Sequence, residues 1–119
     1  MSHSVMWFEV LGENGAQLRE FYGGVFGWTF KMIDPIQYGC VETGEAARGI
    51  PGGVGQTFPN TRSWVTFYVE TPDIQASLAE IQRRGGAVVM PRTVLPDVTL
   101  AVFEDPEGHP IGLVEARPA

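Results

Sequence analysis

A chain of 119 residues, 44% of them hydrophobic, has the size and composition of one globular domain with a shared core. Its 14 acidic and 8 basic residues give a formal net charge of -6, which argues against a nucleic-acid-binding face and against a polybasic membrane anchor. The single cysteine, Cys40, excludes an intramolecular disulfide, and no stretch reads as a signal peptide or a membrane span, so we expect a cytoplasmic protein.

The first half of the chain predicts the element order β-α-β-β-β. Residues 5–11 alternate like a strand, and Asn14 is a suitable N-cap for an amphipathic helix that ends at Gly27. Runs of β formers separated by turn residues predict three further strands, at 28–33, 36–42 and 46–51. The glycines and other turn formers of 52–60 then indicate a linker or a cleft lid.

The second half repeats this order. Residues 64–69 are β formers, Thr71 can cap a helix whose first turn holds Pro72 and Asp73, and a glycine pair ends that helix. Three strands follow, at 87–90, 99–104 and 110–115. We therefore expect one domain, 1–119, built from two β-α-β-β-β repeats at 5–51 and 62–116.

Both repeats open on a similar strand, Trp7-Phe8-Glu9-Val10-Leu11 and later Trp64-Val65-Thr66-Phe67-Tyr68. Alternation along a strand divides each segment into two faces. One face carries Trp7, Glu9 and Leu11 in the first copy, and Trp64, Thr66 and Tyr68 in the second. The opposite sets are wholly apolar and should pack under the helices: Phe8 and Val10, and Val65, Phe67 and Val69.

Two motifs resemble the vicinal oxygen chelate superfamily, which includes glyoxalase I, bleomycin-resistance proteins and extradiol dioxygenases. They are Phe21-Tyr22 before Gly27-Trp28, and the closing run from Asp105-Pro106-Glu107-Gly108 to Gly112-Leu113-Val114-Glu115. The resemblance covers essentially the whole chain. It implies an α+β fold in which two β-α-β-β-β repeats form curled mixed sheets around a shared cleft for a small molecule. It also implies a homodimer, in which strands of a second subunit can complete the cleft.

The metal-dependent members of this superfamily place their ligands on the first and last strands of the repeats. The resemblance puts these positions on Trp7, Trp64, Gly112 and, in the first repeat, a residue near Ile50, Pro51 or Gly52. None of these side chains ligates a metal, whereas a divalent-metal site needs three or four His, Asp, Glu or Cys. We therefore expect no metal and no other cofactor, which disfavours metal-dependent glyoxalase I or dioxygenase activity.

The expected cleft combines aromatic walls with a few polar groups, a composition typical of small-ligand pockets. Glu9 is the candidate catalytic residue, because a carboxylate between aromatic neighbours tends to have a raised pKa and can act as a general base. The alternatives are that Glu9 is solvated or pairs with Arg92, and that the indoles fill a collapsed cleft. The candidate ligand-binding residues are Trp7, Glu9, Tyr38, Cys40, Glu42, Trp64, Thr66 and Tyr68.

The remaining reactive side chains are interpreted as structural. Cys40 is expected to be a packed residue, because no histidine lies near it in a recognisable catalytic arrangement. His3, near the terminus, and His109, in a turn, are expected to be exposed. Arg83 and Arg84 suit the C-terminal end of a helix as solvated charges.

The sequence therefore predicts a metal-independent protein that binds a flat, partly apolar small molecule between Trp7 and Trp64. Glu9, Thr66 and Tyr68 would orient this ligand. One alternative is a metal-independent isomerase or lyase in which Glu9 moves a proton, and a second is a domain that acts mainly through dimer assembly. The expected partners are a small molecule and a second copy of the chain, but neither nucleic acid nor a membrane.

Overall fold

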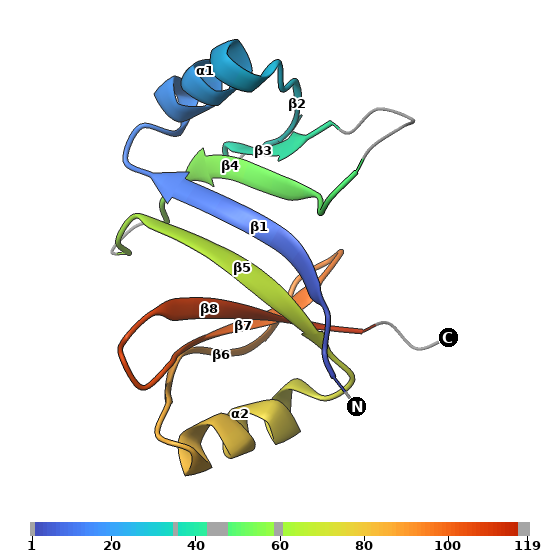
Figure 1. Ribbon diagram of the computed structural model, residues 1–119, viewed down its shortest axis with the longest axis vertical. Helices are drawn as coiled ribbons and strands as arrows, with labels where there is room; N and C mark the ends of the chain where they lie inside the picture. Colours follow the sequence, from blue (N-terminus) through green and yellow to red (C-terminus); the bar gives the residue numbers. More distant parts are fainter. Residues whose placement is uncertain (1, 35, 43–47, 59–60, 117–119) are drawn as a thin grey trace. The chain divides into compact units, whose positions relative to one another are not determined.

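The computed structural model describes residues 2–34, 36–42, 48–58 and 61–116. Within these ranges the chain forms two helices and eight strands (Figure 1). No helix in the described ranges is both long and apolar enough to cross a membrane. In chain order the elements are β1 (Val5–Gly12), α1 (Gly15–Phe26), β2 (Phe30–Ile33), β3 (Tyr38–Val41), β4 (Gly52–Gln56), β5 (Trp64–Thr71), α2 (Ile74–Arg83), β6 (Ala87–Val94), β7 (Thr99–Glu104) and β8 (Pro110–Glu115).

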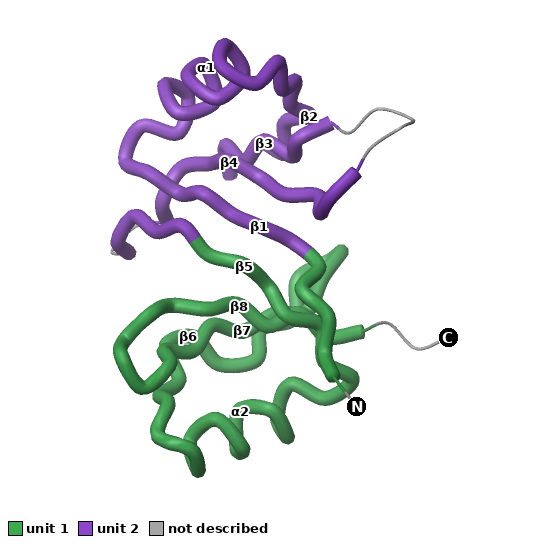
Figure 2. Tube along the Cα trace, viewed as in Figure 1, with its two compact units in different colours: residues 1–6, 66–119 green, residues 7–65 purple. Residues whose placement is uncertain are grey.

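The chain divides into two compact units, coloured separately in Figure 2. Unit 2 comprises Trp7–Val65, and unit 1 comprises Met1–Met6 with Thr66–Ala119. The strand order is β2-β3-β4-β1 in unit 2 and β5-β8-β7-β6 in unit 1. In each unit the opening strand pairs in parallel with the last, and the remaining pairs are antiparallel. The predicted α+β class, with β-α-β-β-β modules and mixed sheets, is confirmed.

Helix α1 begins and ends where its capping residues predict. The Asn14 side chain accepts a hydrogen bond from the backbone N–H of Gln17 at 3.0 Å. At the other end Gly27 adopts the left-handed conformation, with φ 71°, and its N–H donates to the Gly23 carbonyl at 2.8 Å. The helix starts in close contact with β4, because a Cβ on Gly15 would lie 2.7 Å from the backbone of Gly55.

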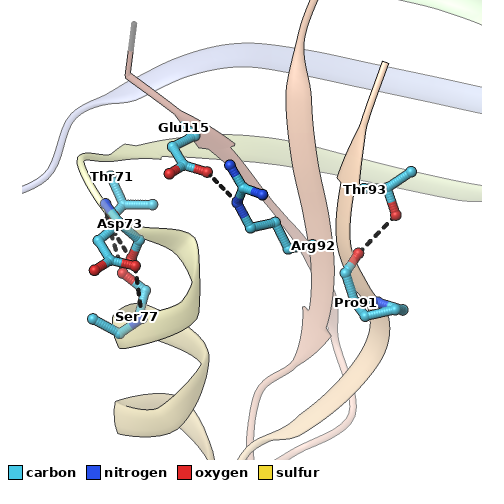
Figure 3. A network of polar contacts seen from close by, with 8 residues as sticks. Thr71, Asp73, Ser77, Pro91, Arg92, Thr93 and Glu115 are labelled. Carbon is cyan, nitrogen blue, oxygen red and sulfur yellow. Dashed lines mark hydrogen bonds and ion pairs between the residues drawn. The ribbon is translucent and has the colours of Figure 1, made fainter. Parts of the chain in front are cut away.

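The prediction that Thr71 caps helix α2 is wrong, because the cap lies two residues later in the chain. Asp73 is the N-cap, and its carboxylate accepts the N–H of Ala76 at 3.1 Å. Thr71 is instead the last residue of β5, and its hydroxyl shares a hydrogen bond with the Ser77 hydroxyl at 2.7 Å (Figure 3). The helix buries Ile74 and Leu78 in a core with Ala101 and Leu113.

The fourth strand of unit 2 lies where we predicted a linker. β4 spans Gly52–Gln56, while 48–51 is not a strand and 46–47 lies outside the described residues. Its glycines are required by neighbouring rings: a Cβ on Gly52 would lie 2.1 Å from the Phe8 ring, and one on Gly53 would lie 2.1 Å from the Tyr38 ring. Although the composition of 52–56 favours turns, packing against aromatic rings therefore stabilises this segment as a strand.

The predicted bounds of β7 and β8 are matched, whereas those of other strands differ. β3 spans Tyr38–Val41 rather than 36–42, and β5 continues past Val69 to Thr71. β2 begins at Phe30 rather than Trp28, and β6 continues past Met90 to Val94. β6 tolerates Pro91 because it is the edge strand of unit 1, and its register with β7 shifts on both sides of Met90.

The predicted packing of the apolar strand faces is only partly right. Phe8 faces the helix side of unit 2, with its ring 5.6 Å from that of Trp28, and Val69 packs against the core beneath α2. Val65 is 75% exposed and Phe67 is 40% exposed, contrary to expectation. The reason is that α2 packs mainly against β6, β7 and β8, and so leaves the start of β5 uncovered.

Candidate functional site

Hydrogen bonds in unit 2 join both repeated tryptophans to one carboxylate. The Trp7 indole donates from Nε1 to Tyr38 Oη at 2.8 Å, and Tyr38 Oη donates to Glu9 Oε1 at 3.0 Å. The Trp64 indole donates from Nε1 to Glu9 Oε2 at 2.7 Å. Trp7, Glu9, Tyr38 and Trp64 therefore form a chain of side chains, which we call the indole–carboxylate network.

The direction of each bond in this network is set by chemistry. An indole N–H can only donate, so Tyr38 must accept from Trp7 and is left to donate its own proton to Glu9. Glu9 consequently acts as an acceptor through both oxygens. Its side chain is only 6% exposed, whereas both indoles and Tyr38 are half-buried. The carboxylate thus lies behind the aromatic rings and holds them by their polar edges.

The network depends on a glycine that the sequence analysis assigned to a linker. In the strand register Glu9 of β1 lies opposite Gly53 of β4, which also pairs with Cys40 of β3. Because Gly53 has no side chain, the Tyr38 ring can lie over its Cα and bring the hydroxyl to Glu9. A glycine inside a strand often marks such a close approach, and this was the available sequence signal.

Two other residues predicted for the site lie outside this network. Cys40 is half-buried on β3, and burial raises the pKa of its thiol, with a smaller opposing effect from nearby Lys31. This favours the packed, unreactive interpretation. Glu42 follows the end of β3 and is exposed, and its backbone N–H donates to the Thr29 carbonyl.

Thr66 and Tyr68, also predicted for the cleft, belong to unit 1. Thr66 is buried, and its hydroxyl donates to the Pro110 carbonyl at 2.6 Å, so it holds β5 to the start of β8. Tyr68 is buried with its ring directly over Gly112, to which it is paired in the strand register. In the structure both side chains therefore contribute to the packing of unit 1.

The positions that resemble chelating positions do not fit a metal ion. Leu11 and Tyr68 are the fifth residues of the two repeated segments, and they pair with Gly55 and Gly112 respectively. Gly55 is therefore the counterpart of Gly112, which corrects the position that we expected at 50–52. A Cβ on Gly112 would lie 2.3 Å from the Tyr68 ring, and one on Gly55 would lie 2.8 Å from the Tyr38 ring. Tyrosine rings fill the space that a ligating side chain would need. Among the described residues no three His, Cys, Asp or Glu gather as a metal site requires.

The other residues weighed from the sequence have separate partners. Arg92, considered as a partner for Glu9, forms an ion pair with Glu115 at 2.6 Å (Figure 3). This pair lies in a pocket of about 870 Å³ in unit 1 that the sequence analysis missed. His3 and His109 are exposed as expected. The expected solvated charges at the end of α2, Arg83 and Arg84, are exposed and pair with Glu80.

Comparison by sequence gives one group of curated relatives. A scan against models of known protein families gives no match. The chain is 29% identical over 118 residues to the anthracycline biosynthesis protein DnrV of Streptomyces peucetius, a match that covers 86% of this chain and 43% of DnrV. The anthracycline biosynthesis protein DauV of Streptomyces sp. strain C5 matches with the same identity and coverage. The chain thus spans less than half the length of these relatives.

Comparison by structure gives neighbours that match along nearly the whole chain. A glyoxalase/bleomycin resistance protein/dioxygenase superfamily member from Vibrio splendidus 12B01 has a TM-score of 0.65 and 14% identity, covering 97% of this chain and 100% of its own. Methylmalonyl-CoA epimerase from Mycobacterium tuberculosis has a TM-score of 0.62 and 12% identity, covering 96% and 88%. At such identities the likeness concerns the fold, and at that level it confirms the resemblance found in the sequence.

Proposed function

We propose that this chain, which has the vicinal oxygen chelate fold, binds a flat, partly apolar small molecule against Trp7 and Trp64 without a metal ion. The observation that carries the proposal is the indole–carboxylate network of unit 2. Glu9 holds Trp64 directly and holds Trp7 through Tyr38. Two aromatic rings are thereby fixed before any ligand arrives.

Fixed rings suit the binding of a flat molecule for an energetic reason. Ordering a mobile side chain on binding costs roughly 0.5–1.5 kcal/mol, and a ring already held by its N–H avoids much of that cost. Both indoles are half-buried, so part of each ring remains accessible for stacking while the polar edge is satisfied internally. This favours an aromatic binding surface over indoles that merely fill space.

The names of the curated relatives support a flat aromatic ligand. DnrV and DauV are both named for anthracycline biosynthesis, and anthracyclines contain a planar system of fused rings. Such a ring system has the shape and apolar character that two indole faces would stack upon. We therefore propose fused-ring aromatic compounds as the ligand class.

The residues at the superfamily's chelating positions support the proposed independence from metal. Trp7 and Trp64 use their only polar atoms on Tyr38 and Glu9, and Gly55 and Gly112 are covered by tyrosine rings. Affinity must then come from stacking and burial of apolar area, at about 25 cal/mol per Å². In this proposal Glu9 positions the rings and does not act as a general base.

The test is a fluorescence titration with quinizarin, a flat three-ring anthraquinone. The titration uses the Trp28→Phe variant, because Trp7 and Trp64 are then its two tryptophans and the fluorescence reports on them alone. We expect saturable quenching by quinizarin and none by adamantanol, which is apolar but not flat. We expect Trp64→Ala to weaken binding at least tenfold, and an absence of saturable quenching would refute the proposal.

A matched pair of variants tests the network itself. Tyr38→Phe keeps the ring over Gly53 but removes the hydroxyl that joins Trp7 to Glu9, so quinizarin affinity should fall several-fold. Tyr22→Phe removes a hydroxyl from a tyrosine on α1 and should leave affinity unchanged. Equal losses in both variants would show that the network has no special role.

Glu9→Gln separates binding from the alternative isomerase or lyase. Glutamine keeps one acceptor oxygen, so quinizarin binding should persist with at most a several-fold loss. If the protein is instead an isomerase or lyase, the wild type should exchange an acidic C–H proton of a bound ligand with deuterated water. Glu9→Gln should then abolish this exchange while the affinity for the ligand is unchanged. NMR of that proton measures the exchange.

A further inference from the structure

The turn before β3 ends on a residue in an uncommon backbone conformation. Gln37 has φ 55°, and among the described residues it is the one non-glycine residue whose φ is positive. This left-handed conformation is disfavoured roughly five- to thirtyfold in a residue that carries a Cβ, so neighbouring groups must hold it. Gln37 directly precedes Tyr38, the residue that joins Trp7 to Glu9. The backbone at Gln37 therefore sets the direction from which Tyr38 enters the indole–carboxylate network.

Arg19 of α1 holds this turn against β4. Its guanidinium donates from Nη1 to the carbonyl of Gln37 at 3.1 Å and to the carbonyl of Val54 at 3.2 Å. A charged donor makes a stronger hydrogen bond than a neutral one, and an arginine keeps its charge in proteins. The backbone N–H of Gln56 donates to the same Gln37 carbonyl at 3.3 Å. A single side chain thus ties the turn to the neighbouring strand.

The stem of Arg19 lies in a space that a glycine leaves. Gly39 of β3 is buried, and a Cβ on it would lie 2.6 Å from Arg19 Cδ. The stem therefore passes over the residue that follows Tyr38, while the guanidinium bonds to the residue that precedes it. Arg19 is half-buried, and α1 packs against β4 within unit 2 (Figure 1). Contacts on both sides of Tyr38 consequently fix the backbone that carries its ring.

The Tyr38 hydroxyl depends on this backbone for its two hydrogen bonds. The ring lies against Gly53 and Gly55, where an added Cβ would come within 2.1 and 2.8 Å of it, so the ring has no room to move toward β4. The bonds to Trp7 and Glu9 are 2.8 and 3.0 Å long, and a hydrogen bond is lost at about 3.6 Å. A shift of the turn by about 1 Å would therefore release the Trp7 indole.

We propose that Arg19 is a positioning residue for the aromatic binding surface of unit 2. It holds Gln37 in the left-handed conformation and thereby keeps the Tyr38 hydroxyl bonded to Trp7. This inference rests on the proposed function, because it concerns the same site. Arg19 donates to backbone carbonyls, so it acts on the indole through Tyr38 and not through the ligand. The alternative is that Arg19 only fastens α1 to the sheet.

Hydrogen exchange of the indole N–H groups, followed by NMR in isotope-labelled protein without ligand, tests the inference. Arg19→Met keeps the stem but removes the donors, so exchange of the Trp7 N–H should become at least roughly tenfold faster. The Trp64 N–H bonds directly to Glu9, so its exchange should change by less than about twofold. Arg83→Met is the matched control, because this arginine of α2 is exposed and pairs with Glu80, and it should alter neither rate.

Substitutions at Gln37 distinguish positioning from fastening of the helix. Asparagine adopts the left-handed conformation more readily than glutamine, so adding Gln37→Asn to Arg19→Met should return Trp7 exchange to within about threefold of wild type. Gln37→Val alone should accelerate the exchange although Arg19 is intact, because a β-branched residue is poorly tolerated at positive φ. The Gln37 side chain is exposed, so this variant should fold. If Arg19 only fastened α1, neither substitution would have these effects.

Unchanged Trp7 exchange in Arg19→Met, an equal acceleration at Trp64, or no recovery with Gln37→Asn would overturn the proposal. Circular dichroism melting checks that each variant is folded, and Gln37→Val decides the question if Arg19→Met does not fold. Quinizarin affinity should follow the same order, with a several-fold loss in Arg19→Met and recovery in the double variant. Because the exchange is measured without ligand, a failure of the wild type to bind quinizarin would refute the proposed function and leave the exchange result intact.

Discussion

Unit 2 carries Glu9 at the third position of its opening repeat segment, where unit 1 carries Thr66. Glu9 accepts hydrogen bonds from Tyr38 and Trp64 and so organises aromatic side chains. Thr66 donates to the backbone carbonyl of Pro110 and so holds two strands together. The same position in a repeated strand therefore serves a candidate binding site in one unit and the fold in the other.

The two helices differ in a parallel way. α2 buries Ile74 and Leu78 against its sheet and presents a charged end in which Arg83 and Arg84 pair with Glu80. α1 buries Gly15 and presents exposed phenylalanines. Each helix occupies the same place in its module, so the difference lies in which surface each leaves to solvent. We infer that α2 contributes more to the stability of unit 1 than α1 contributes to that of unit 2, because α1 leaves more of its apolar surface exposed.

Truncating one apolar residue in each helix should give the largest contrast. Leu78→Ala removes a side chain that is 5% exposed and should lower the free energy of unfolding by about 2–5 kcal/mol. Phe21→Ala removes an exposed ring and should cost less than about 0.5 kcal/mol in monomeric protein. Urea unfolding at low protein concentration measures both values. Similar losses would contradict the difference in packing.

Removing the polar group from the repeated strand should give the next largest effect. Glu9→Leu leaves the half-buried Tyr38 hydroxyl and Trp64 N–H without their shared acceptor, and because water can reach half-buried groups the cost should lie at the lower end of about 1–3 kcal/mol for each group. Thr66→Val leaves one carbonyl, that of Pro110, without this donor and should cost about 1–2 kcal/mol. The same urea unfolding experiment compares them, with Glu9→Gln as the control that retains an acceptor. An equal loss in all three variants would remove the distinction between the two positions.

Local signals predicted much of this fold, because they act over a few residues. Alternating apolar residues gave β1 and β7 nearly to the residue, and Asn14 and Gly27 marked the ends of α1. At α2 two residues of capping type lie two positions apart: Asp73 caps the helix through the N–H of Ala76, and the Thr71 hydroxyl bonds to Ser77. Sequence alone could not decide between them, since that choice depends on how β5 enters the helix.

The least predictable element was β4, whose glycines read as a linker. These glycines are required by tertiary contacts, because the rings of Phe8 and Tyr38 lie over Gly52 and Gly53. The contact between Tyr38 and Gly53 also explains why the candidate site could be predicted only in part. Alternation placed Trp7 and Glu9 on one face, but the hydrogen bond from Tyr38 to Glu9 passes over Gly53 and required the strand register. The hydrogen bond from Thr66 to the Pro110 carbonyl could not be predicted either, because its partner is distant in sequence.

The smallest expected contrast is in the response to acid. In unit 1, Asp105 accepts the backbone N–H groups of His109 and Glu107 at 3.0 and 2.9 Å. The bond from His109 is the main reason why the pKa of Asp105 lies below its usual value. A carboxyl whose pKa is lowered by folding stabilises the protein above its unfolded-state pKa of about 3.9, and this contribution is lost as the pH falls through the folded-state pKa. The cap of α1 in unit 2, Asn14, does not titrate.

Asp105→Asn should therefore flatten the acid side of the stability profile. The amide oxygen can still accept the two backbone N–H groups, so the melting temperature at neutral pH should fall only slightly. Below about pH 4 the wild-type melting temperature should decline more steeply than that of the variant, because only the wild-type side chain takes up a proton. Asn14→Ala is the control in unit 2: it should lower the melting temperature by a similar amount at every pH, since the lost cap is uncharged. Thermal melts followed by circular dichroism across this range give the slopes, and parallel curves for wild type and Asp105→Asn would show that the turn does not respond to acid.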